Sequence, residues 1–400
     1  MDIHSVVRFN LIMNFPRLKL GVTATALLFA AAVARPEPGA FVPSNPPEMK
    51  PLAGQHSPAH KTAALFQRGA NLGNYLEIPK GQFWGVRITT NDFDRIKAEG
   101  FDHIRVPVGW QYYAGPGPDY KLEDDIFRRV DFVVTNTLAR GLAVMINVHH
   151  FDAFTTDPAG RTDELIALWR QIAAHYAAAP DNLVFELLNE PHDAATTEIV
   201  CPIYAKLIAE IRQTNPKRTL VVSPGNWGGI KELKDLVLPA EDDNLLVTVH
   251  CYEPYRFTHQ GANWGGPEVR GLRGIKFPGP PETPLVLDTN LSPAVQHWIS
   301  NYNTLPTEKN PSSRAAFEPL LKMTRQWSDY YGRPVYVGEF GAYTRADPQS
   351  RANYYREFRE ALAEQKLGWA IWDWNSGFHY WDSRRDEPAP GMREALFGKE

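Results

Sequence analysis

The stretch from Leu183 to Pro191 reads Leu-Val-Phe-Glu-Leu-Leu-Asn-Glu-Pro and indicates the fold of the chain around it. Its first half is almost continuously apolar, as in a β-strand buried on both faces of a sheet. The run then breaks into an amide at Asn189, a carboxylate at Glu190 and a proline. Parallel α/β folds collect such side chains at the carboxyl ends of their strands. We therefore expect Asn189 and Glu190 at the rim of a parallel sheet.

Strand-like and helix-like stretches alternate along most of the chain. Eight strands that each lead into a helix predict an α/β fold, a (β/α)8 TIM barrel built as a single domain. An open, doubly wound sheet would alternate in nearly the same way, but its polar residues would gather at one switch point instead of following nearly every strand. The expected strands are residues 65–70, 103–108, 142–148, 183–188, 219–223, 245–250, 334–338 and 369–374. The expected helices are residues 91–99, 123–140, 162–178, 196–213, 230–236, 313–331, 351–365 and 392–397.

Capping signals support these helix boundaries. Thr162, followed by two acidic residues, has the composition of a helix N-terminus. Glycines stand between helix-like runs and the next strands, where a left-handed C-cap belongs. These glycines are Gly100, Gly141, Gly332 and Gly368.

The segment 253–311 separates the sixth strand from its helix and makes a long β6-α6 loop. It is rich in Gly and Pro, and loops of this length inside a domain are usually functional. We expect it to form a wall of a ligand cleft, with a short helix near residues 294–300. Its aromatic residues argue for packing and against a disordered insertion; they include Tyr255, Phe257, Trp264 and Trp298.

The N-terminus has the pattern of an export signal. Arg17 and Lys19 precede an apolar run, residues 20–33, that ends in Ala-Val-Ala at Ala34. The run is too short to span a bilayer, so we expect cleavage near Ala34, no membrane span in the mature protein, and a secreted or periplasmic location. A start at Met13 instead of the first methionine would give the signal more usual proportions.

The region after the signal is rich in proline and lacks periodicity, which indicates a linker or a strap over the domain. The expected organisation is a signal peptide (residues 1–34), this linker or strap (35–62) and one barrel domain (63–400).

Composition narrows the class of ligand. The net charge is -4 and no basic run occurs in the mature part, so we expect no nucleic-acid partner. Aromatic residues reach 12%, with 11 Trp, and many lie in loop-like segments, which favours a flat, neutral ligand such as a sugar ring. The two cysteines, Cys201 and Cys251, have no metal-ligand spacing, and buried free thiols are favoured over a disulfide. We expect a monomer.

Polar residues at the strand ends would converge on one mouth of the barrel. Glu190 and Glu339 stand out because each follows an apolar run, and a buried carboxylate is costly unless it is paired or used. The strand-end residues are Asn71, Arg105, His149, His150, Asn189, Glu190, Asn226, Trp227, His250, Tyr252, Glu339 and Trp372.

The His149-His150 pair suggests a metal site, but adjacent residues of a regular strand face opposite ways. Both rings cannot then point into one mouth, so we expect no metal site there. We assign His149 to the mouth and leave His150 as a loop or packing residue.

The strand-end motifs resemble those of glycoside hydrolase family 5, the retaining β-glycanases of a larger clan of (β/α)8 enzymes. The resemblance covers about residues 65–397 and implies that Glu190 is the general acid/base and Glu339 the nucleophile. It implies no cofactor and no metal, and it places Arg105, His149, Asn189, His250, Tyr252 and Trp372 around the substrate. The motifs are Ile-Arg-Val-Pro-Val (104–108), Ile-Asn-Val-His (146–149), Phe-Glu-Leu-Leu-Asn-Glu-Pro (185–191), His-Cys-Tyr (250–252), Val-Gly-Glu-Phe-Gly (337–341) and Trp-Ala-Ile-Trp-Asp (369–373).

The chemistry of a retaining glycosidase makes these assignments intelligible. One carboxylate attacks the anomeric carbon and a second, still protonated, protonates the leaving oxygen, at a separation of about 5 to 5.5 Å. Arg105 and the Tyr252 hydroxyl near Glu339 would keep that carboxylate ionised. Glu190, between aromatic walls and a negative neighbour, would hold its proton.

Other polar and aromatic residues have open assignments. Asn189 is placed to bond a sugar 2-hydroxyl and Trp372 to stack on a pyranose ring. Glu186 fits an ion-pair partner inside the barrel, and Asp373 and Asn375 are rim contacts or turn residues. Five tryptophans either line the cleft or fill gaps between helices and barrel: Trp84, Trp110, Trp227, Trp264 and Trp374.

Together these features predict an exported, metal-independent hydrolase that acts with retention on β-glucan oligo- or polysaccharides, and an endo-β-1,4-glucanase in particular. An exo-β-1,3-glucanase, a β-glucosidase and a β-mannanase share the mechanism and stay open. Two other classes are a non-catalytic glycan-binding barrel and a metal-dependent barrel hydrolase.

Overall fold

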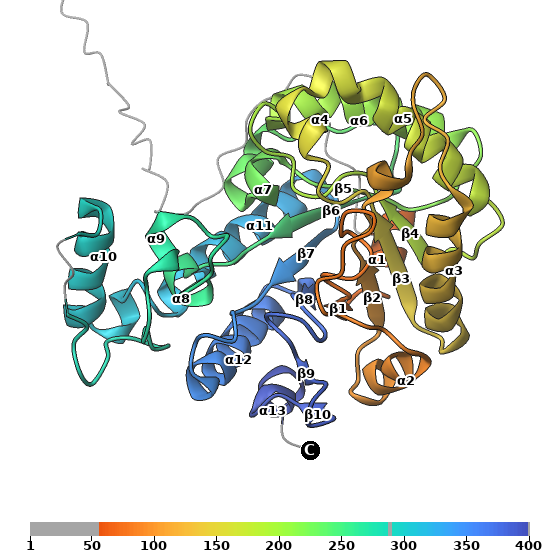
Figure 1. Ribbon diagram of the computed structural model, residues 1–400. Coiled ribbons are helices and arrows are strands. Elements are labelled where there is room, and N and C mark those ends of the chain that lie inside the picture. The colour runs from red at the N-terminus through yellow and green to blue at the C-terminus, as the bar shows by residue number, and fades with distance from the viewer. Residues whose placement is uncertain (1–55, 287–289, 399–400) are drawn as a thin grey trace, which may run out of the picture. The chain divides into compact units, whose positions relative to one another are not determined.

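Eight parallel strands close into a barrel in the order β1 to β8, with helices around it (Figure 1). The computed structural model describes residues 56–286 and 290–398; the expected signal peptide and residues 35–55 of the expected linker lie outside them. The predicted (β/α)8 barrel is therefore confirmed and the open sheet is wrong. The strands are β1 (Arg68–Asn71), β2 (His103–Val106), β3 (Ala143–Asn147), β4 (Leu183–Glu186), β5 (Leu220–Val222), β6 (Leu245–His250), β7 (Val335–Phe340) and β8 (Gly368–Ile371).

Each barrel strand leads into a helix, as predicted. The fifth of these, η2, is a 3-10 helix, and the others are α-helices. In strand order they are α2 (Thr90–Ala98), α3 (Asp124–Ala139), α5 (Pro158–His175), α6 (Thr197–Arg212), η2 (Ile230–Asp235), α11 (Glu318–Tyr331), α12 (Pro348–Glu364) and α13 (Met392–Phe397). Shorter elements lie in the loops: η1 (Trp110–Tyr113), α4 (Asp152–Thr156), α7 (Gly225–Gly228), β9 (Trp381–Asp382) and β10 (Glu387–Pro388). None of the helices in the described ranges is long and apolar enough to cross a bilayer.

The start of α5 differs from the prediction. Thr162 lies inside the helix, where its hydroxyl donates to the carbonyl of Pro158 at 2.7 Å. The helix begins at Pro158 and is capped by Asp157, whose carboxylate accepts from the backbone N–H of Gly160. Proline at the first helical position and aspartate before it are the stronger start signal.

The glycine signals were right at three positions and wrong at one. Gly100, Gly141 and Gly332 have positive φ, as helix C-caps require. Gly368 is instead the first residue of β8, and Lys366 takes the left-handed conformation with φ 52°. Glycine is needed at 368 for space, because a Cβ there would lie 2.0 Å from the carbonyl oxygen of Phe66.

The amino-terminal end of the barrel is closed by apolar side chains. A short helix, α1 (Pro58–Ala63), occupies residues that were predicted as linker, and the hydroxyls of Thr62 and Thr219 lie 2.7 Å apart. Phe66 packs on an interior layer that includes Met145 and Leu246. Among the described residues, the interior of the barrel is therefore reached from the carboxyl ends of its strands.

The long loop after β6 contains several short elements, α8 (Tyr255–Thr258), α9 (Pro267–Arg270), α10 (Pro293–Thr304), η3 (Thr307–Lys309) and η4 (Arg314–Ala316). Phe257 is fully buried, whereas Trp264 is 62% exposed. Trp298 stacks on Tyr302. This loop packs as predicted, and the two cysteines are free and buried.

Candidate active site

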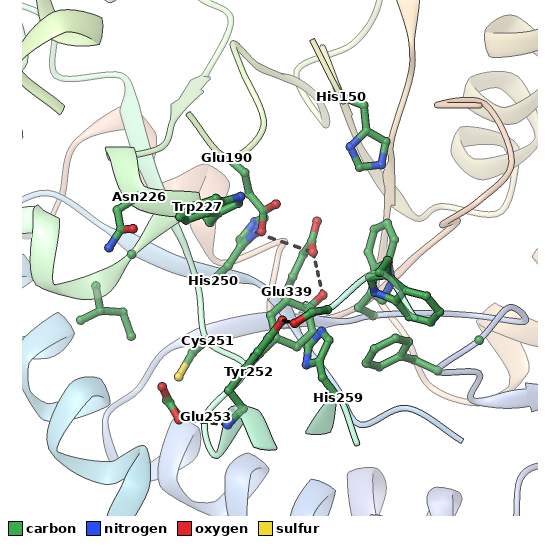
Figure 2. A pocket seen from close by; sticks show the side chains of 18 of the residues that line it. His150, Glu190, Asn226, Trp227, His250, Cys251, Tyr252, Glu253, His259 and Glu339 are labelled. Atoms are coloured by element: carbon green, nitrogen blue, oxygen red, sulfur yellow. Dashed lines mark hydrogen bonds and ion pairs between the residues drawn. The ribbon is translucent and has the colours of Figure 1, made fainter. Parts of the chain in front are cut away.

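A cleft of about 1120 Å³ lies over the carboxyl ends of the strands. Its lining comes from the segments after β1, β3, β4, β5, β6 and β8 and from β7, together with the long loop after β6. Glu190, His250 and Glu339 meet at its centre, and His150 and Asn226 lie at opposite sides of the view (Figure 2). The predicted convergence of strand ends on one mouth is present.

The two carboxylates face each other across a short gap. Glu190 follows β4 with φ 44°, and Glu339 lies in β7. One oxygen from each and a ring nitrogen of His250 lie within 4.8 Å of one another. A spacing this short suits a pair in which one carboxylate attacks the anomeric carbon directly, because an inverting pair needs room for a water molecule.

Arg105 of β2 is the charge centre beneath the carboxylates. Its guanidinium is fully buried and contacts both oxygens of Glu186 at 2.6 and 2.7 Å and one oxygen of Glu339 at 2.6 Å. It also donates to the side-chain oxygens of Asn71 at 2.8 Å and Asn189 at 2.7 Å. These bonds hold Glu339 and Asn189 in place, and they give Glu186 the interior ion-pair position predicted for it.

Replacing Arg105 by methionine should destabilise the protein by about 3 to 5 kcal/mol, because Glu186 and Glu339 would become buried charges without a counterion. Urea unfolding would measure the change. Arg128 is the matched control: its side chain is 70% exposed in a pair with Asp125, so Arg128→Met should change stability by less than about 0.5 kcal/mol. Equal losses in both variants would contradict the role given to Arg105.

His250 and Tyr252, at and just after the end of β6, complete the carboxylate contacts. His250 Nδ1 lies 2.7 Å from Glu190 Oε1 and 3.6 Å from Glu339 Oε2. The Tyr252 hydroxyl donates to Glu339 Oε2 at 2.7 Å. Glu339 therefore receives hydrogen bonds from Arg105 on one oxygen and from Tyr252 on the other.

The proton affinities of these groups follow from burial. Burial raises the pKa of Glu190 to about 7, and the charge of Arg105 only partly opposes the rise. Burial also raises the pKa of Glu339, while His250 and Arg105 act in the opposite direction. Arg105 and Tyr252 make the contacts predicted to keep Glu339 ionised, and both lower its pKa, but desolvation by burial is the larger effect. Burial lowers the pKa of His250 to about 4, so its imidazole is neutral near pH 7.

The two adjacent histidines correct a prediction. His149 and His150 both line the cleft, with ring centroids 4.3 Å apart, so the argument that they must face opposite ways was wrong. The strand alternation does not apply, because β3 ends at Asn147 and His150 has φ 51°. His149 is buried and parallel to the ring of Trp372, with centroids 5.8 Å apart, and burial holds its pKa well below the usual range. Its ring is therefore a neutral partner for Trp372.

The predicted tryptophans divide into two groups. Trp84, Trp227 and Trp264 line the cleft and are 46%, 51% and 62% exposed. Trp110 and Trp374 are fully buried and belong to the core. Three exposed indoles around one cleft provide flat faces for sugar rings.

Asp373 and Asn375 follow Trp372 in a turn. Asp373 is fully buried and accepts from the backbone N–H and the hydroxyl of Ser376. Asn375 donates to the carbonyl of Arg87 at 3.4 Å. Neither lines the cleft, so the turn assignment is the right one.

Two cleft residues, Asn74 and His259, were not predicted from the sequence. Both line the cleft, and His259 stacks, with centroids 4.4 Å apart, on Tyr255, which lies in the predicted cleft wall. Asn74 has φ 61°, and its backbone N–H donates to the buried carboxylate of Glu77. The aromatic and histidine content of the segment 255–259 was the available signal for the loop residues. Nothing in the local pattern marked Asn74.

The spacing of Glu190, His250 and Glu339 would also suit a metal ion. The donor atoms are already engaged, however: Arg105 and Tyr252 contact the two oxygens of Glu339, and His250 Nδ1 contacts Glu190. A guanidinium bonded to a would-be ligand supplies the positive charge that a metal would bring. The contacts therefore favour an acid and nucleophile pair.

Comparison with known proteins identifies the family. The family model described as "Cellulase (glycosyl hydrolase family 5)" matches residues 66–377. The chain belongs to this family. The resemblance inferred from the strand-end motifs is thus confirmed.

The chain is also similar to two proteins named as endoglucanases. Endoglucanase H of Acetivibrio thermocellus is 29% identical over 76% of this chain, and Endoglucanase 3 of Fibrobacter succinogenes is 28% identical over 80% of it. The chain spans only 29% and 51% of the lengths of these two relatives. Among solved structures, endoglucanase Cel5A from the hyperthermophilic Thermotoga maritima is 34% identical, with a TM-score of 0.74, over 86% of this chain and 100% of that chain.

Proposed function

We propose that this family 5 protein is a retaining endo-β-1,4-glucanase that cleaves β-glucan chains. The observation that carries the proposal is the facing pair Glu190 and Glu339, whose oxygens lie within 4.8 Å in a cleft with three exposed tryptophans. The relatives named as endoglucanases support the substrate class.

In the first step, the Glu339 carboxylate attacks the anomeric carbon and the glycosidic C–O bond breaks. The leaving oxygen takes the proton of Glu190. Because the pKa of Glu190 is about 7, this carboxyl is mostly protonated below neutral pH. Arg105 and Tyr252 hold the Glu339 oxygens during the attack.

In the second step, water attacks the anomeric carbon of the glycosyl-enzyme. Glu190, now ionised, takes the proton of the water and the bond to Glu339 breaks. Two inversions leave the configuration unchanged. Asn189, fixed by Arg105, would donate to the sugar 2-hydroxyl, and Trp372, which lines the cleft, would provide the face for the ring.

Hydrolysis of defined oligosaccharides and polymers, with the anomeric configuration followed in the first minutes, tests the proposal. We expect β-configured products, internal cleavage of β-1,4-glucan and unchanged rates in a chelator. Initial release of α-configured product would overturn the mechanism. Preferential cleavage of β-1,3-glucan, mannan or terminal glucose would select one of the other three activities instead. Binding without turnover would indicate a glycan-binding barrel.

Trp264 is the most exposed cleft tryptophan, and its replacement by alanine should raise KM for long oligosaccharides by about 2- to 13-fold, the loss of one stacking contact worth about 0.5 to 1.5 kcal/mol. Short substrates that do not reach it should lose less. Tyr330→Ala is the control, because Tyr330 is 45% exposed on α11 and does not line the cleft. Equal effects on short and long substrates would remove Trp264 from the binding surface.

We also propose that the protein is exported and cleaved near Ala34. Expression of the full chain in a bacterial host, followed by N-terminal sequencing of the exported protein, should give Arg35 or a residue close to it as the first residue. Retention of the intact N-terminus would contradict this. We further propose that the protein acts as a monomer, which light scattering of the purified enzyme would test.

A further inference from the structure

Two buried polar atoms behind Glu190 have no hydrogen-bond partner among the described residues. They are Nε2 of His250 and Oγ1 of Thr248, which stand two residues apart on β6. Each such atom costs about 1 to 3 kcal/mol when its hydrogen-bonding capacity is not used. Their position beside the contact between His250 and Glu190 makes them relevant to the chemistry.

Both atoms face the same small space inside the barrel, over the Cα of Gly338. A Cβ added at Gly338 would lie 2.4 Å from Thr248 Oγ1 and 3.0 Å from His250 Nε2. Glycine at this position in β7 therefore keeps the space between the two atoms open. The two atoms are not hydrogen-bonded to each other as they stand; a rotation of the Thr248 side chain, or one bridging water, would link the hydroxyl to the ring nitrogen.

We propose that the Thr248 hydroxyl donates a hydrogen bond to Nε2 of His250 and so keeps the single ring proton on Nδ1, which makes Thr248 a positioning residue for Glu190. Within the described residues the hydroxyl proton has no other acceptor, and buried donors are left unpaired more rarely than acceptors. This inference rests on the proposed function, because it concerns the partner of the acid/base.

The position of the ring proton matters in both chemical steps. With the proton on Nδ1, His250 donates to Glu190 Oε1 at 2.7 Å and leaves the other oxygen for the leaving group or the water. With the proton on Nε2, Nδ1 would accept from protonated Glu190 and draw the acid proton away from the substrate. Thr248 thus selects the tautomer that serves the reaction.

Loss of the Thr248 hydroxyl should weaken the Nδ1–H donor and make ionised Glu190 less stable. The Glu190 pKa should then rise, and the decline of kcat/KM at high pH should move upward. The charged and titratable groups around His250 stay the same in such a variant. They are Glu186 of β4 and Glu190 after it, Glu339 of β7, Arg105 of β2, His149 after β3 and Tyr252 after β6.

The test compares Thr248→Val, which has nearly the same shape, with Thr248→Ser, which keeps the hydroxyl. In the valine variant we expect the pH midpoint of the high-pH decline in kcat/KM to move upward by about half to one pH unit, which corresponds to the free energy of one hydrogen bond. In the serine variant this midpoint should stay at the wild-type value. An unchanged midpoint in Thr248→Val, or an equal shift in both variants, would overturn the proposal.

Nitrogen NMR of the His250 ring in the wild-type protein provides a second measurement that needs no variant. The spectrum should show a protonated Nδ1 and a hydrogen-bonded, unprotonated Nε2 near pH 7; a proton on Nε2 would overturn the proposal. Failure of the proposed function is distinguishable, because it would appear as inverted products or as full activity of a Glu190→Gln variant. Neither result depends on Thr248.

Discussion

Replacement of Glu339 by glutamine should lower kcat by about 10⁴-fold or more, while oligosaccharide binding persists. The amide has nearly the same shape as the carboxylate but cannot attack the anomeric carbon. The amide has a single oxygen, so it can accept from Tyr252 or from Arg105 but not from both, whereas the carboxylate accepts from each on a separate oxygen. Turnover and binding would be measured separately, by reducing-sugar release and by calorimetry. Glu308→Gln is the control, since Glu308 lies exposed on η3 outside the cleft and should retain full activity.

Replacing Glu339 by the smaller alanine tests the same role through the configuration of the product. Glu339→Ala opens space on the face of the sugar that the nucleophile occupies, so azide can attack there in a single displacement. With an activated β-glycoside, the expected product is the α-configured glycosyl azide, formed with partial recovery of activity. A β-configured azide from this variant would assign the nucleophile to another residue.

The barrel could be predicted from the sequence because its signals are local. Each strand is a short apolar run, and the polar residue that ends it lies next to it in the chain. For β6 the predicted and observed bounds agree, because His250 both ends the apolar run and enters the site. The helix starts were harder to place, since Asp157 with Pro158 and Thr162 offer competing caps little more than one turn apart.

The errors at the site come from assuming regular geometry at strand ends. His150 was excluded from the mouth by strand alternation, but the chain has already left the strand and adopts positive φ there. Glu190, Asn226 and Trp227 also have positive φ, so the direction of each side chain at this rim depends on its own backbone conformation and not on strand alternation. Asn74 belongs to the same class, which is why no periodic pattern could identify it.

The raised pKa of Glu339 shows a second limit of sequence reasoning. Charged neighbours can be read from motifs, and both Arg105 and Tyr252 were placed correctly. The extent of desolvation depends on how completely the barrel encloses the carboxylate, and Glu339 is only 4% exposed. Contacts were thus predictable, whereas the balance between burial and charge required coordinates.

Replacement of Glu190 by glutamine should lower kcat/KM for unactivated glucan chains by about 10²- to 10⁴-fold, the usual contribution of a general acid. In the wild-type enzyme kcat/KM should fall as pH rises through about 7, because Glu190 then loses the proton that the leaving oxygen needs. Glutamine does not titrate in this range, so this limb should disappear from the pH profile of the variant. The profile of each enzyme between pH 4 and 9 would be recorded on the same oligosaccharide.

Substrates with different leaving groups distinguish the role of Glu190 from that of the nucleophile. Aryl glycosides with acidic phenols need little protonation, so in Glu190→Ala the first step should stay fast and the glycosyl-enzyme should accumulate as a burst of phenol. Azide should then speed turnover by attacking that intermediate, and the product should be the β-configured azide, opposite to the product of Glu339→Ala. The same configuration from both variants would mean that the two carboxylates do not divide the chemistry between acid and nucleophile.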